Sequence, residues 1–366
     1  MRESLYIGIM SGTSLDGVDA ALVDFNSSTP SLVQTYFLAY DKYLREQLLA
    51  LNQAGYDELH RAALLSNKLS RSYADAVEGL LGKSGISSQS ITAIGCHGQT
   101  VRHCPQSESA YSIQLGNAAL LAELTGITVV ADFRNRDIAA GGQGAPLVPA
   151  FHQVMFGRPE KHRIIVNIGG IANITSLSPK GEVIGFDCGP GNILMDAWCL
   201  QHKGSIYDHN GSWAETGCII PGLLEALLAF SFFSLPPPKS TGREMFNSEW
   251  LKSYLHGKES PKDVQATLLR LSVEAIAQSI KFHFPEVEEI YLCGGGARNG
   301  KLVAELEAAL PGKSVNLTDM LGIDADWMEA FAFAWLAKQT ISKVPGNLPS
   351  VTGAQGHRIL GAIYTA

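Results

Sequence analysis

The opening of the chain is a series of short apolar runs, rich in residues that are typical of strands. Residues 5–10, 18–25 and 31–40 are rich in aliphatic, β-branched and aromatic side chains. We therefore expect three consecutive strands, the first two joined by a hairpin. Apolar residues then recur three and four positions apart over 45–53 and 58–85, which predicts two helices.

A strand–helix–strand order follows. A short buried strand is predicted over 91–98, a helix over 116–126 and a further strand over 127–133. Parallel strands are joined by crossover connections such as helices, so this order predicts a parallel extension of the first sheet.

The second half repeats the opening order. Strands are predicted over 163–169, 170–177 and 181–189, and a strongly amphipathic helix over 263–284. The glycine-rich stretch 136–152 lies between the two halves, and there we expect the chain to cross to a second domain.

This repetition predicts an α/β protein with two related domains. The first is expected to cover residues 1–135 and to be joined by the C-terminal tail, about residues 345–366. The second is expected to cover residues 136–344, including a long helix over 325–342. A length of 366 residues also exceeds what one core usually supports.

Composition narrows the class of function. The chain is 46% hydrophobic and 17% charged, an enzyme-like mixture. Its net charge is −7 and its basic residues do not cluster, which argues against nucleic acid or a membrane surface as partner. No apolar run is long enough to span a bilayer, no signal peptide is visible, and the six scattered cysteines include no CxxC, so we expect a cytoplasmic protein.

One cluster of potential zinc ligands needs weighing. The stretch "CHGQTVRHC" contains Cys96, His97, His103 and Cys104. Their spacing fits no standard zinc pattern, and adjacent residues of an extended segment point to opposite sides. We therefore do not expect a zinc site here.

The hairpin tip Gly12–Gly17, "GTSLDG", could hold a polyphosphate. Glycines let backbone N–H groups approach an anion, Thr13 and Ser14 add hydroxyls, and Asp16 could hold Mg²⁺ directly or through water. A polar hairpin with turn glycines is the alternative. The tip is not a Walker A loop, since Gly-Lys-Ser/Thr and a following helix are missing.

Two further glycine clusters strengthen the nucleotide interpretation. Gly169 and Gly170 form a second tight strand–strand junction, with Asn173 close by in the sequence. Gly294–Gly296 lie between a strand and a helix, where backbone could approach a nucleoside; a plain strand–helix link or a dinucleotide turn is the alternative.

Several polar side chains are candidates for the acceptor site. Asp187 ends a strand before a glycine-rich turn, where it could act in catalysis or cap the next helix. Glu329 interrupts an apolar helix, so it is either buried in a polar contact or solvated. His97, Gln99 and Arg134 end two strands of the first half, and the loop 239–243 is either a lid over a phosphate or a surface loop.

Eight segments in order resemble one bacterial family, the anhydro-N-acetylmuramic acid kinases of the actin-like sugar-kinase superfamily. They are "GIMSGTSLDGVD", "GCHGQTVRH", "VVADFRNRDIAAGGQGAPLVP", "NIGGIANIT", "FDCGPGN", "PPKSTGREMF", "CGGGARN" and "DWMEAFAFAWLA". The resemblance implies two actin-like (ribonuclease H-like) domains around a deep cleft, each with a mixed central sheet flanked by helices. It also implies a homodimer.

The resemblance assigns roles to the candidate residues. Asp187 is implied to activate a water that opens the 1,6-anhydro ring, so that O6 accepts the γ-phosphoryl group of ATP and N-acetylmuramic acid 6-phosphate forms for peptidoglycan recycling. Asp16 is implied to bind Mg²⁺. Sugar contacts are implied for His97, Gln99, Arg134 and Glu329. ATP contacts are implied for Gly12, Thr13, Ser14, Leu15, Asp16, Gly17, Val18, Asp19, Gly169, Gly170, Asn173, Gly294, Gly295 and Gly296.

Two alternatives stay open from the sequence alone. The same fold could serve a kinase of an ordinary amino sugar, which would act on a free 6-hydroxyl group. An actin-like protein that binds nucleotide for assembly rather than phosphoryl transfer would also carry the phosphate loops.

Overall fold

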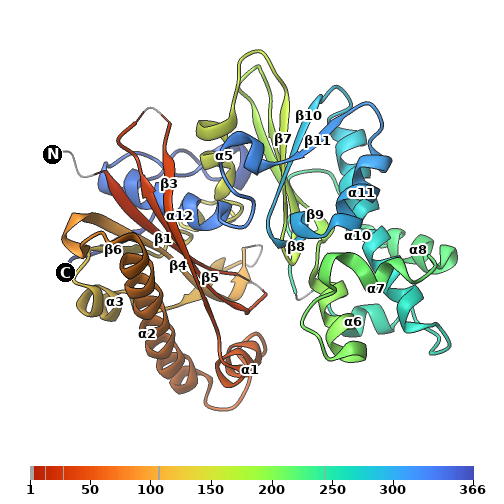
Figure 1. Cartoon of the computed structure of the whole chain (residues 1–366), viewed down its shortest axis with the longest axis horizontal. Helices are drawn as coiled ribbons and strands as arrows, with labels where there is room; N and C mark the ends of the chain where they lie inside the picture. Colours follow the sequence, from red (N-terminus) through yellow and green to blue (C-terminus); the bar gives the residue numbers. More distant parts are fainter. Residues whose placement is uncertain (1–3, 13, 28, 106–107, 244) are drawn as a thin grey trace. The chain divides into compact units, whose positions relative to one another are not determined.

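The computed structural model of the chain describes residues 4–12, 14–27, 29–105, 108–243 and 245–366. It divides into two compact units (Figure 1). Unit 1 comprises Met1–Met155 and Trp327–Ala366, and unit 2 comprises Phe156–Asp326. Within the described residues, no helix combines the length and apolar character needed to cross a bilayer.

The sheet of unit 1 has the strand order β12-β6-β4-β1-β2-β3, with β5 paired to β4. The first three strands are antiparallel, whereas β1, β4 and β6 run parallel, which confirms the predicted opening and its parallel extension. The strands are β1 Leu5–Ser11, β2 Gly17–Asp24, β3 Ser31–Ala39, β4 Ile91–Cys104, β5 Tyr111–Leu115, β6 Val129–Ala131 and β12 Ala362–Tyr364.

Strand β4 is longer than predicted. It continues past residue 98 to Cys104 because it pairs with β5 in an antiparallel hairpin. The sequence did not predict this continuation because β4 is only partly buried beyond Gln99. A partly buried strand needs no continuous apolar run, and the end of "CHGQTVRHC" is polar.

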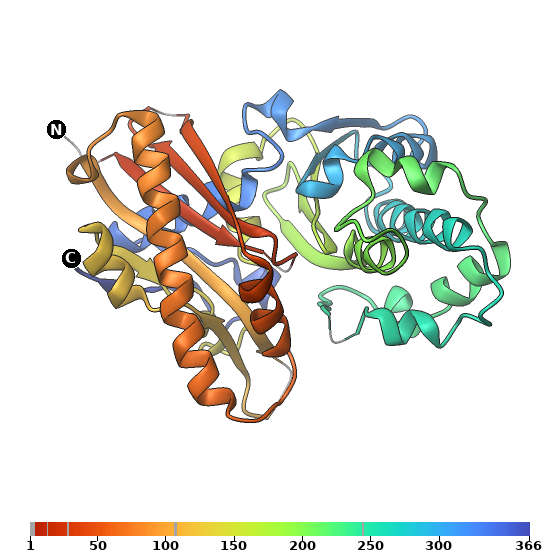
Figure 2. The same cartoon turned by 60° about the horizontal axis from the view of Figure 1, so that its bottom comes forward.

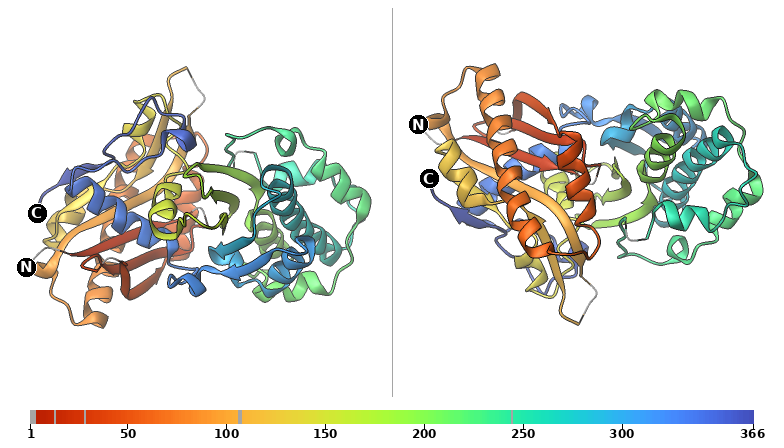
Figure 3. Two further views of the ribbon diagram at one scale, coloured as in Figure 1. Left: turned by 90° about the horizontal axis from the view of Figure 1, so that it is seen from above. Right: turned by 90° about the horizontal axis from the view of Figure 1, so that it is seen from below.

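Two helices cover opposite faces of this sheet. Ile7 and Ile9 point to one face, where they join the core formed with α2 (Glu58–Ser84). Gly8 points to the other face, and a Cβ there would lie 1.7 Å from the carbonyl oxygen of Ala330 in α12 (Met328–Ile341). The views from above and below show α12 and α2 on these two sides (Figure 3). The other helices of this unit are α1 Lys42–Ala50, α3 Ala118–Thr125, α4 Asn135–Ile138, α5 Val148–Phe156 and α13 Pro349–Thr352.

The observed unit boundaries differ from the predicted domain boundaries, residues 1–135 and 136–344. Helix α12 belongs to unit 1 rather than to the second domain, because β1 and β4 carry glycines that let it approach their backbones. Residues 136–155 also stay with unit 1. There the fully buried Asp137 accepts hydrogen bonds from Gly144 N (2.8 Å), Asn347 Nδ2 (2.7 Å) and Thr352 Oγ1 (2.8 Å).

The sheet of unit 2 repeats this topology. Its order is β11-β10-β7-β8-β9, with β7, β8 and β9 antiparallel and β10 parallel to both β7 and β11. The elements are β7 Arg163–Ile168, β8 Ile171–Leu177, β9 Val183–Pro190, β10 Glu289–Cys293, β11 Ser314–Leu317, α6 Ile193–Lys203, α7 Ser212–Glu215, α8 Pro221–Leu228, α9 Ser248–Lys252, α10 Pro261–His283 and α11 Gly300–Ala309.

Helix α10 forms the centre of the helical layer of unit 2. It packs on β8 and β9 and contacts α6, α7, α8 and α11, which surround it in Figure 2. The predicted helix is confirmed, but it is buried on more than the one face that an amphipathic pattern indicates, because helices pack around it from Val264 to Ile280.

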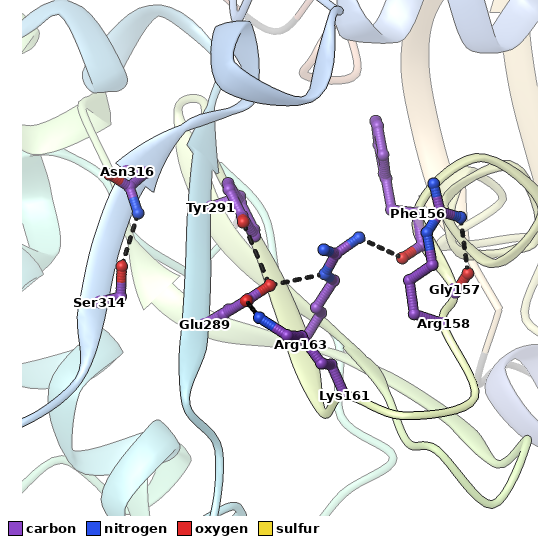
Figure 4. A network of polar contacts seen from close by, with 9 residues as sticks. All are labelled: Phe156, Gly157, Arg158, Lys161, Arg163, Glu289, Tyr291, Ser314 and Asn316. Atoms are coloured by element: carbon purple, nitrogen blue, oxygen red, sulfur yellow. Dashed lines mark hydrogen bonds and ion pairs between the residues drawn. The ribbon is translucent and has the colours of Figure 1, made fainter. Parts of the chain in front are cut away.

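A charged network fixes the first strand of unit 2 (Figure 4). Glu289 of β10 pairs with Arg163 of β7 (2.7 Å) and with Lys161, and it accepts a hydrogen bond from Tyr291 (3.1 Å). Arg163 also donates to the carbonyl of Phe156 (3.2 Å), the first residue of the unit. The network therefore fastens the chain where it enters unit 2.

The two units share one pattern: three antiparallel strands, then two parallel strands beside the first, with helices on the sheets. The predicted α/β class, with two related domains that each have a mixed sheet flanked by helices, is therefore confirmed. The β12 tail pairs with β6, so the predicted return of the C-terminal tail to the first sheet is confirmed.

Candidate active site

The tip of the β1–β2 hairpin is held by one apolar anchor. Leu15 has φ +56° and a buried side chain in the core of unit 1. The Asp16 carbonyl accepts a hydrogen bond from Tyr40 N (2.9 Å). These contacts leave the side chains of Ser14 and Asp16 exposed, and Ser14 Oγ donates to Asp16 Oδ1 (2.7 Å). Thr13 lies outside the described residues.

The residues predicted to bind ATP in this hairpin differ in whether packing within unit 1 already explains their identity. A Cβ on Gly17 would lie 2.4 Å from the Leu38 carbonyl, so packing against β3 alone requires that glycine. Gly12 has room for a Cβ, the nearest atom being 3.7 Å away, so its small size is not needed by the fold. Val18 is fully buried and Asp19 half-buried, so the side chain of Val18 belongs to the core.

A buried hydrogen-bond network holds the start of the hairpin loop. Ser11 Oγ donates to Gln99 Oε1 (2.5 Å) and lies 2.7 Å from Tyr40 Oη, while Gln99 Nε2 donates to the Gly12 carbonyl (3.2 Å). Burial raises the pKa of Tyr40 well above its usual value, so it stays a neutral phenol. Gln99 is 1% exposed, and its amide is used to hold the start of the loop.

His97 and Gln99 were predicted to end their strand but lie within β4, because β4 continues to Cys104. The predicted proximity to Arg134 holds, since His97 contacts Arg134 just beyond the end of β6. Arg134 donates to His97 Nε2 (2.8 Å) and to the Gly144 carbonyl (2.7 Å). Burial and the Arg134 charge lower the pKa of His97 to about 3, so the imidazole is neutral. Glu329 lies half-buried in the first turn of α12, where a carboxylate interacts favourably with the helix dipole.

The histidines and Cys96 of the stretch considered for zinc make other interactions or are held in their neutral form. His97 faces a guanidinium cation, and His103 Nδ1 lies 3.0 Å from Ser112 Oγ. Burial raises the pKa of Cys96 to about 12. Among the described residues, no three His, Cys, Asp or Glu side chains gather as a metal site requires.

In unit 2 the glycine turn between β7 and β8 rests on the start of α6. The Gly169 carbonyl accepts from Asn192 N (2.8 Å), and the Gly170 carbonyl accepts from Gly191 N (2.8 Å). A Cβ on Gly191 would lie 2.3 Å from the Gly169 carbonyl oxygen, so only glycine fits there, whereas Gly169 itself makes only ordinary contacts. The turn is therefore rigid and presents a surface without side chains.

Three polar residues form one row across this sheet. Asn173 of β8 is in register with Asn167 of β7 and with Asp187 of β9, and paired residues of antiparallel strands share a face. Asn167 is 7% exposed, and its Oδ1 has no hydrogen-bond partner among the described residues. A buried acceptor without a partner costs about 1–3 kcal/mol, which a ligand donor would recover.

Asp187 lies near the end of β9, as predicted. Its Oδ2 accepts a hydrogen bond from Thr241 N (2.8 Å), and its backbone N–H donates to the Lys239 carbonyl (3.0 Å). The loop 239–243, left between a lid and a surface loop by the sequence, thus contacts the predicted catalytic carboxylate directly.

The three consecutive glycines after β10 are not equivalent. Gly294 has φ +79°, and a Cβ there would lie 2.2 Å from Asn167 Oδ1. Gly296 packs on Ile168, which a Cβ would approach to 2.3 Å. Gly295 meets nothing within 4 Å, so the fold leaves open space over this one residue.

Sequence reasoning gave no role to Gly191, and it did not predict that Asn167 Oδ1 is buried without a partner among the described residues or that Thr241 contacts Asp187. Asn167 occurs inside the quoted "NIGGIANIT", and a polar residue in an otherwise apolar strand was the signal that could have found it. The contact of Thr241 with Asp187 joins residues 54 positions apart, and no local pattern reports it.

The two units define an α/β protein with two mixed sheets of the same topology, a glycine-bearing hairpin after the first strand of each sheet and a carboxylate near the end of β9, as expected of the kinases that the sequence resembles. Comparison with known proteins then gives the family. The chain belongs to the anhydro-N-acetylmuramic acid kinase family, whose sequence model matches residues 4–366.

Close relatives share nearly the whole length. The anhydro-N-acetylmuramic acid kinase of Nitrosomonas europaea is 66% identical over 361 residues, covering 99% of both chains. That of Nitrosospira multiformis is 62% identical over 366 residues, covering 100% of both. That of Pasteurella multocida is 49% identical over 369 residues, covering 100% of this chain and 98% of the relative. Because the chain belongs to this family, we set aside the two alternative functions that the sequence left open, a kinase of an ordinary amino sugar and a nucleotide-dependent assembly protein.

Proposed function

We propose that the chain opens 1,6-anhydro-N-acetylmuramic acid with water and phosphorylates it at O6. A water adds its oxygen to carbon 1, the bond from carbon 1 to O6 breaks, and O6 takes the γ-phosphoryl group of ATP. The products are N-acetylmuramic acid 6-phosphate and ADP, and the proton lost by the water balances the reaction. The observation that carries this proposal is the fixed carboxylate of Asp187 at the end of β9.

Asp187 is the proposed general base. A base must be held in one orientation to take a proton in the transition state, and such help is typically worth ~100- to 10,000-fold. The hydrogen bond from Thr241 N fixes Oδ2, and the register with Asn173 fixes the strand. The anhydro sugar has no hydroxyl hydrogen on O6, so the proton comes from the attacking water.

ATP contacts are proposed for both glycine hairpins and the third glycine cluster. Gly12, Gly169 and Gly295 support this, because the fold itself does not require glycine there and backbone N–H groups can approach phosphate or a nucleoside. Asn167 Oδ1 is proposed to accept a hydrogen bond from the ligand. The remaining proposed ATP residues are Thr13, Ser14, Leu15, Asp16, Gly17, Val18, Asp19, Gly170, Asn173, Gly294 and Gly296.

Magnesium is proposed to bind at Asp16. The exposed carboxylate is a hard oxygen donor of the kind that Mg²⁺ prefers, either directly or through water. When bound, Mg²⁺ neutralises charge on the phosphates during phosphoryl transfer.

Sugar contacts are proposed for His97, Gln99, Arg134 and Glu329. The muramic acid substrate carries a lactyl carboxylate, and a guanidinium is its natural partner because the two planar groups form paired hydrogen bonds. Arg134 is held by His97 and Gly144, which preorganises it for such a contact. Gln99 also donates to the Gly12 carbonyl, which links the proposed sugar contacts to the first phosphate hairpin.

Isotope-labelled water tests the reaction directly. The protein is incubated with ATP, Mg²⁺ and the anhydro sugar in oxygen-18 water, and the label is located in the product by mass spectrometry. We expect one labelled oxygen on carbon 1 and none in the bridge to phosphorus. Unlabelled sugar phosphate, or label in the phosphoryl group, would contradict the proposed order of bonds.

A homodimer in the cytoplasm is proposed from the family. Light scattering of the purified protein tests the oligomeric state, for which a mass of twice 39.3 kDa is expected.

A further inference from the structure

A segment of unit 2 runs along the edge strand of its sheet, and we name residues 231–241 the strap. Strand β9 is the last strand in the sheet order, so its outer edge has no neighbouring strand there. The strap pairs with it: Asp187 N donates to the Lys239 carbonyl (3.0 Å), and Thr241 N donates to Asp187 Oδ2 (2.8 Å). Further along, the ring of Phe233 lies where a Cβ of Gly189 would be, at 2.6 Å.

The side chain of Lys239 closes the strap on itself. Lys239 is 7% exposed, and its Nζ donates to the carbonyls of Phe232 (3.1 Å) and Phe233 (3.2 Å). The ammonium also lies 4.7 Å from the centroid of the Phe232 ring. These bonds tie the end of the strap to its beginning across the intervening prolines.

A buried ammonium is costly, and packing alone does not explain it. Removing a charge from water is unfavourable unless hydrogen bonds and opposite charge offset the loss. A methionine would fill the same volume without that cost. The geometry points to a use for this residue, because the strap that its hydrogen bonds close is the segment whose backbone binds Asp187.

We propose that Lys239 is a positioning residue for Asp187. Its ammonium locks the strap so that Thr241 N holds Oδ2 of the base, and its charge favours the ionised carboxylate. This inference rests on the proposed role of Asp187 as the base.

Two titratable groups near this pair, Cys188 and His283, are uncharged near neutral pH. Burial raises the pKa of the neighbouring Cys188 thiol to about 12. Burial, and then the Lys239 charge, lower the pKa of His283 at the end of α10. Burial lowers the pKa of Lys239 itself, while Cys188 and Asp187 oppose that shift. Loss of the ammonium therefore removes a positive charge that favours the ionised carboxylate. We expect the pH below which kcat falls, the acid limb of the activity profile, to move to higher pH.

The test compares Lys239→Met and Lys239→Gln with the wild type. Lys252→Met, a change of the same type on exposed α9, is the control, and Asp187→Asn reports on the base itself. For each protein, kcat, the KM for ATP, the affinity for a non-hydrolysable ATP analogue and the dependence of kcat on pH are measured. Glutamine can still donate to the two carbonyls but carries no charge, so it separates locking from charge.

We expect Lys239→Met to lower kcat at least tenfold, a share of the ~100- to 10,000-fold effect of a general base, and to move the acid limb to higher pH. Affinity for the ATP analogue should stay within about twofold, since an effect on the base does not act on ground-state nucleotide binding. Lys239→Gln should show the shifted limb with a smaller loss of kcat, and it decides the question if the methionine variant does not fold.

Three outcomes would contradict parts of this reasoning. An unshifted acid limb in both variants would overturn the inference, whatever happens to kcat, because a purely structural lysine gives that result. Wild-type kcat in Lys239→Met beside an inactive Asp187→Asn would also overturn it while leaving the proposed function intact. An active Asp187→Asn would instead refute the role of the base on which the inference rests.

Discussion

Replacing Asp137 by asparagine tests how the glycine-rich segment after α4 is held. Asp137 is fully buried, and its two oxygens accept three hydrogen bonds from protein donors. An asparagine can keep the oxygen that faces Asn347 and Thr352, but then its NH₂ group faces Gly144 N at 2.8 Å. After the substitution, the asparagine NH₂ group and the Gly144 N–H are two donors that face each other without an acceptor.

The structure gives the size of the effect. A hydrogen bond to a charged group contributes about 1.5–3 kcal/mol, and a buried donor left without an acceptor costs about 1–3 kcal/mol. Partial relaxation of the loop reduces the sum, so we expect Asp137→Asn to lower the free energy of unfolding by about 3 kcal/mol. For a unit of this size, each kcal/mol moves the melting temperature by about 2–4 °C.

Calorimetry and steady-state kinetics are the assays. The transition of unit 1 should move down by roughly 6–12 °C, and the KM for the anhydro sugar should rise, since the Gly144 carbonyl also holds Arg134. Asp132→Asn makes the same change on an exposed residue nearby and should alter stability by no more than about 0.5 kcal/mol. A loss from Asp137→Asn as small as that of this control would refute the reasoning.

Four further predictions concern the phosphate and catalytic sites. Asp187→Asn should lower kcat by ~100- to 10,000-fold in a coupled ADP assay and leave affinity for an ATP analogue nearly unchanged; retention of more than about a tenth of the activity contradicts the assignment. Asp16→Ala should raise the Mg²⁺ concentration needed for half-maximal activity, and an unchanged Mg²⁺ titration would remove Asp16 from the metal site. Gly296→Ala should destabilise the protein by about 1–3 kcal/mol in urea unfolding, because its Cβ would meet Ile168 at 2.3 Å. Gly295→Ala should keep stability but weaken ATP binding in calorimetric titration, and wild-type affinity would exclude a close approach of ATP at that residue.

The elements that local pattern determines were predicted well. Strands β1 to β3 and β7 to β9 follow from short apolar runs separated by glycine turns, and helices α2 and α10 follow from apolar spacing. The position of Asp187 near a strand end was visible because glycines and a proline follow it directly.

Partners distant in sequence could not be predicted. Helix α12 is apolar on nearly every side, and such a pattern indicates burial without telling which sheet the helix covers. Gly17 was predicted to contact ATP, yet its fit against Leu38 depends on how β3 returns to β2. The contact of the strap with Asp187 likewise depends on tertiary folding.

The discontinuity of unit 1 has a consequence for biosynthesis. Unit 2 is one uninterrupted stretch of chain, so all of its strands have been translated once residue 326 is made. At that moment β1 and β4 still lack the helix that lies against Gly8 and Gly95. Domains tend to fold as units during synthesis, so the inserted unit can mature first.

Helix α12 can cover this face only after the inserted unit has been translated. A nascent chain that stops at residue 326 lacks both α12 and the edge strand β12, and the face of β1 and β4 that α12 covers is left open. A message truncated after codon 326 should thus yield a protein whose inserted unit is protected from proteases while the surrounding unit is digested. Strand β1 is translated long before the helix that completes its packing.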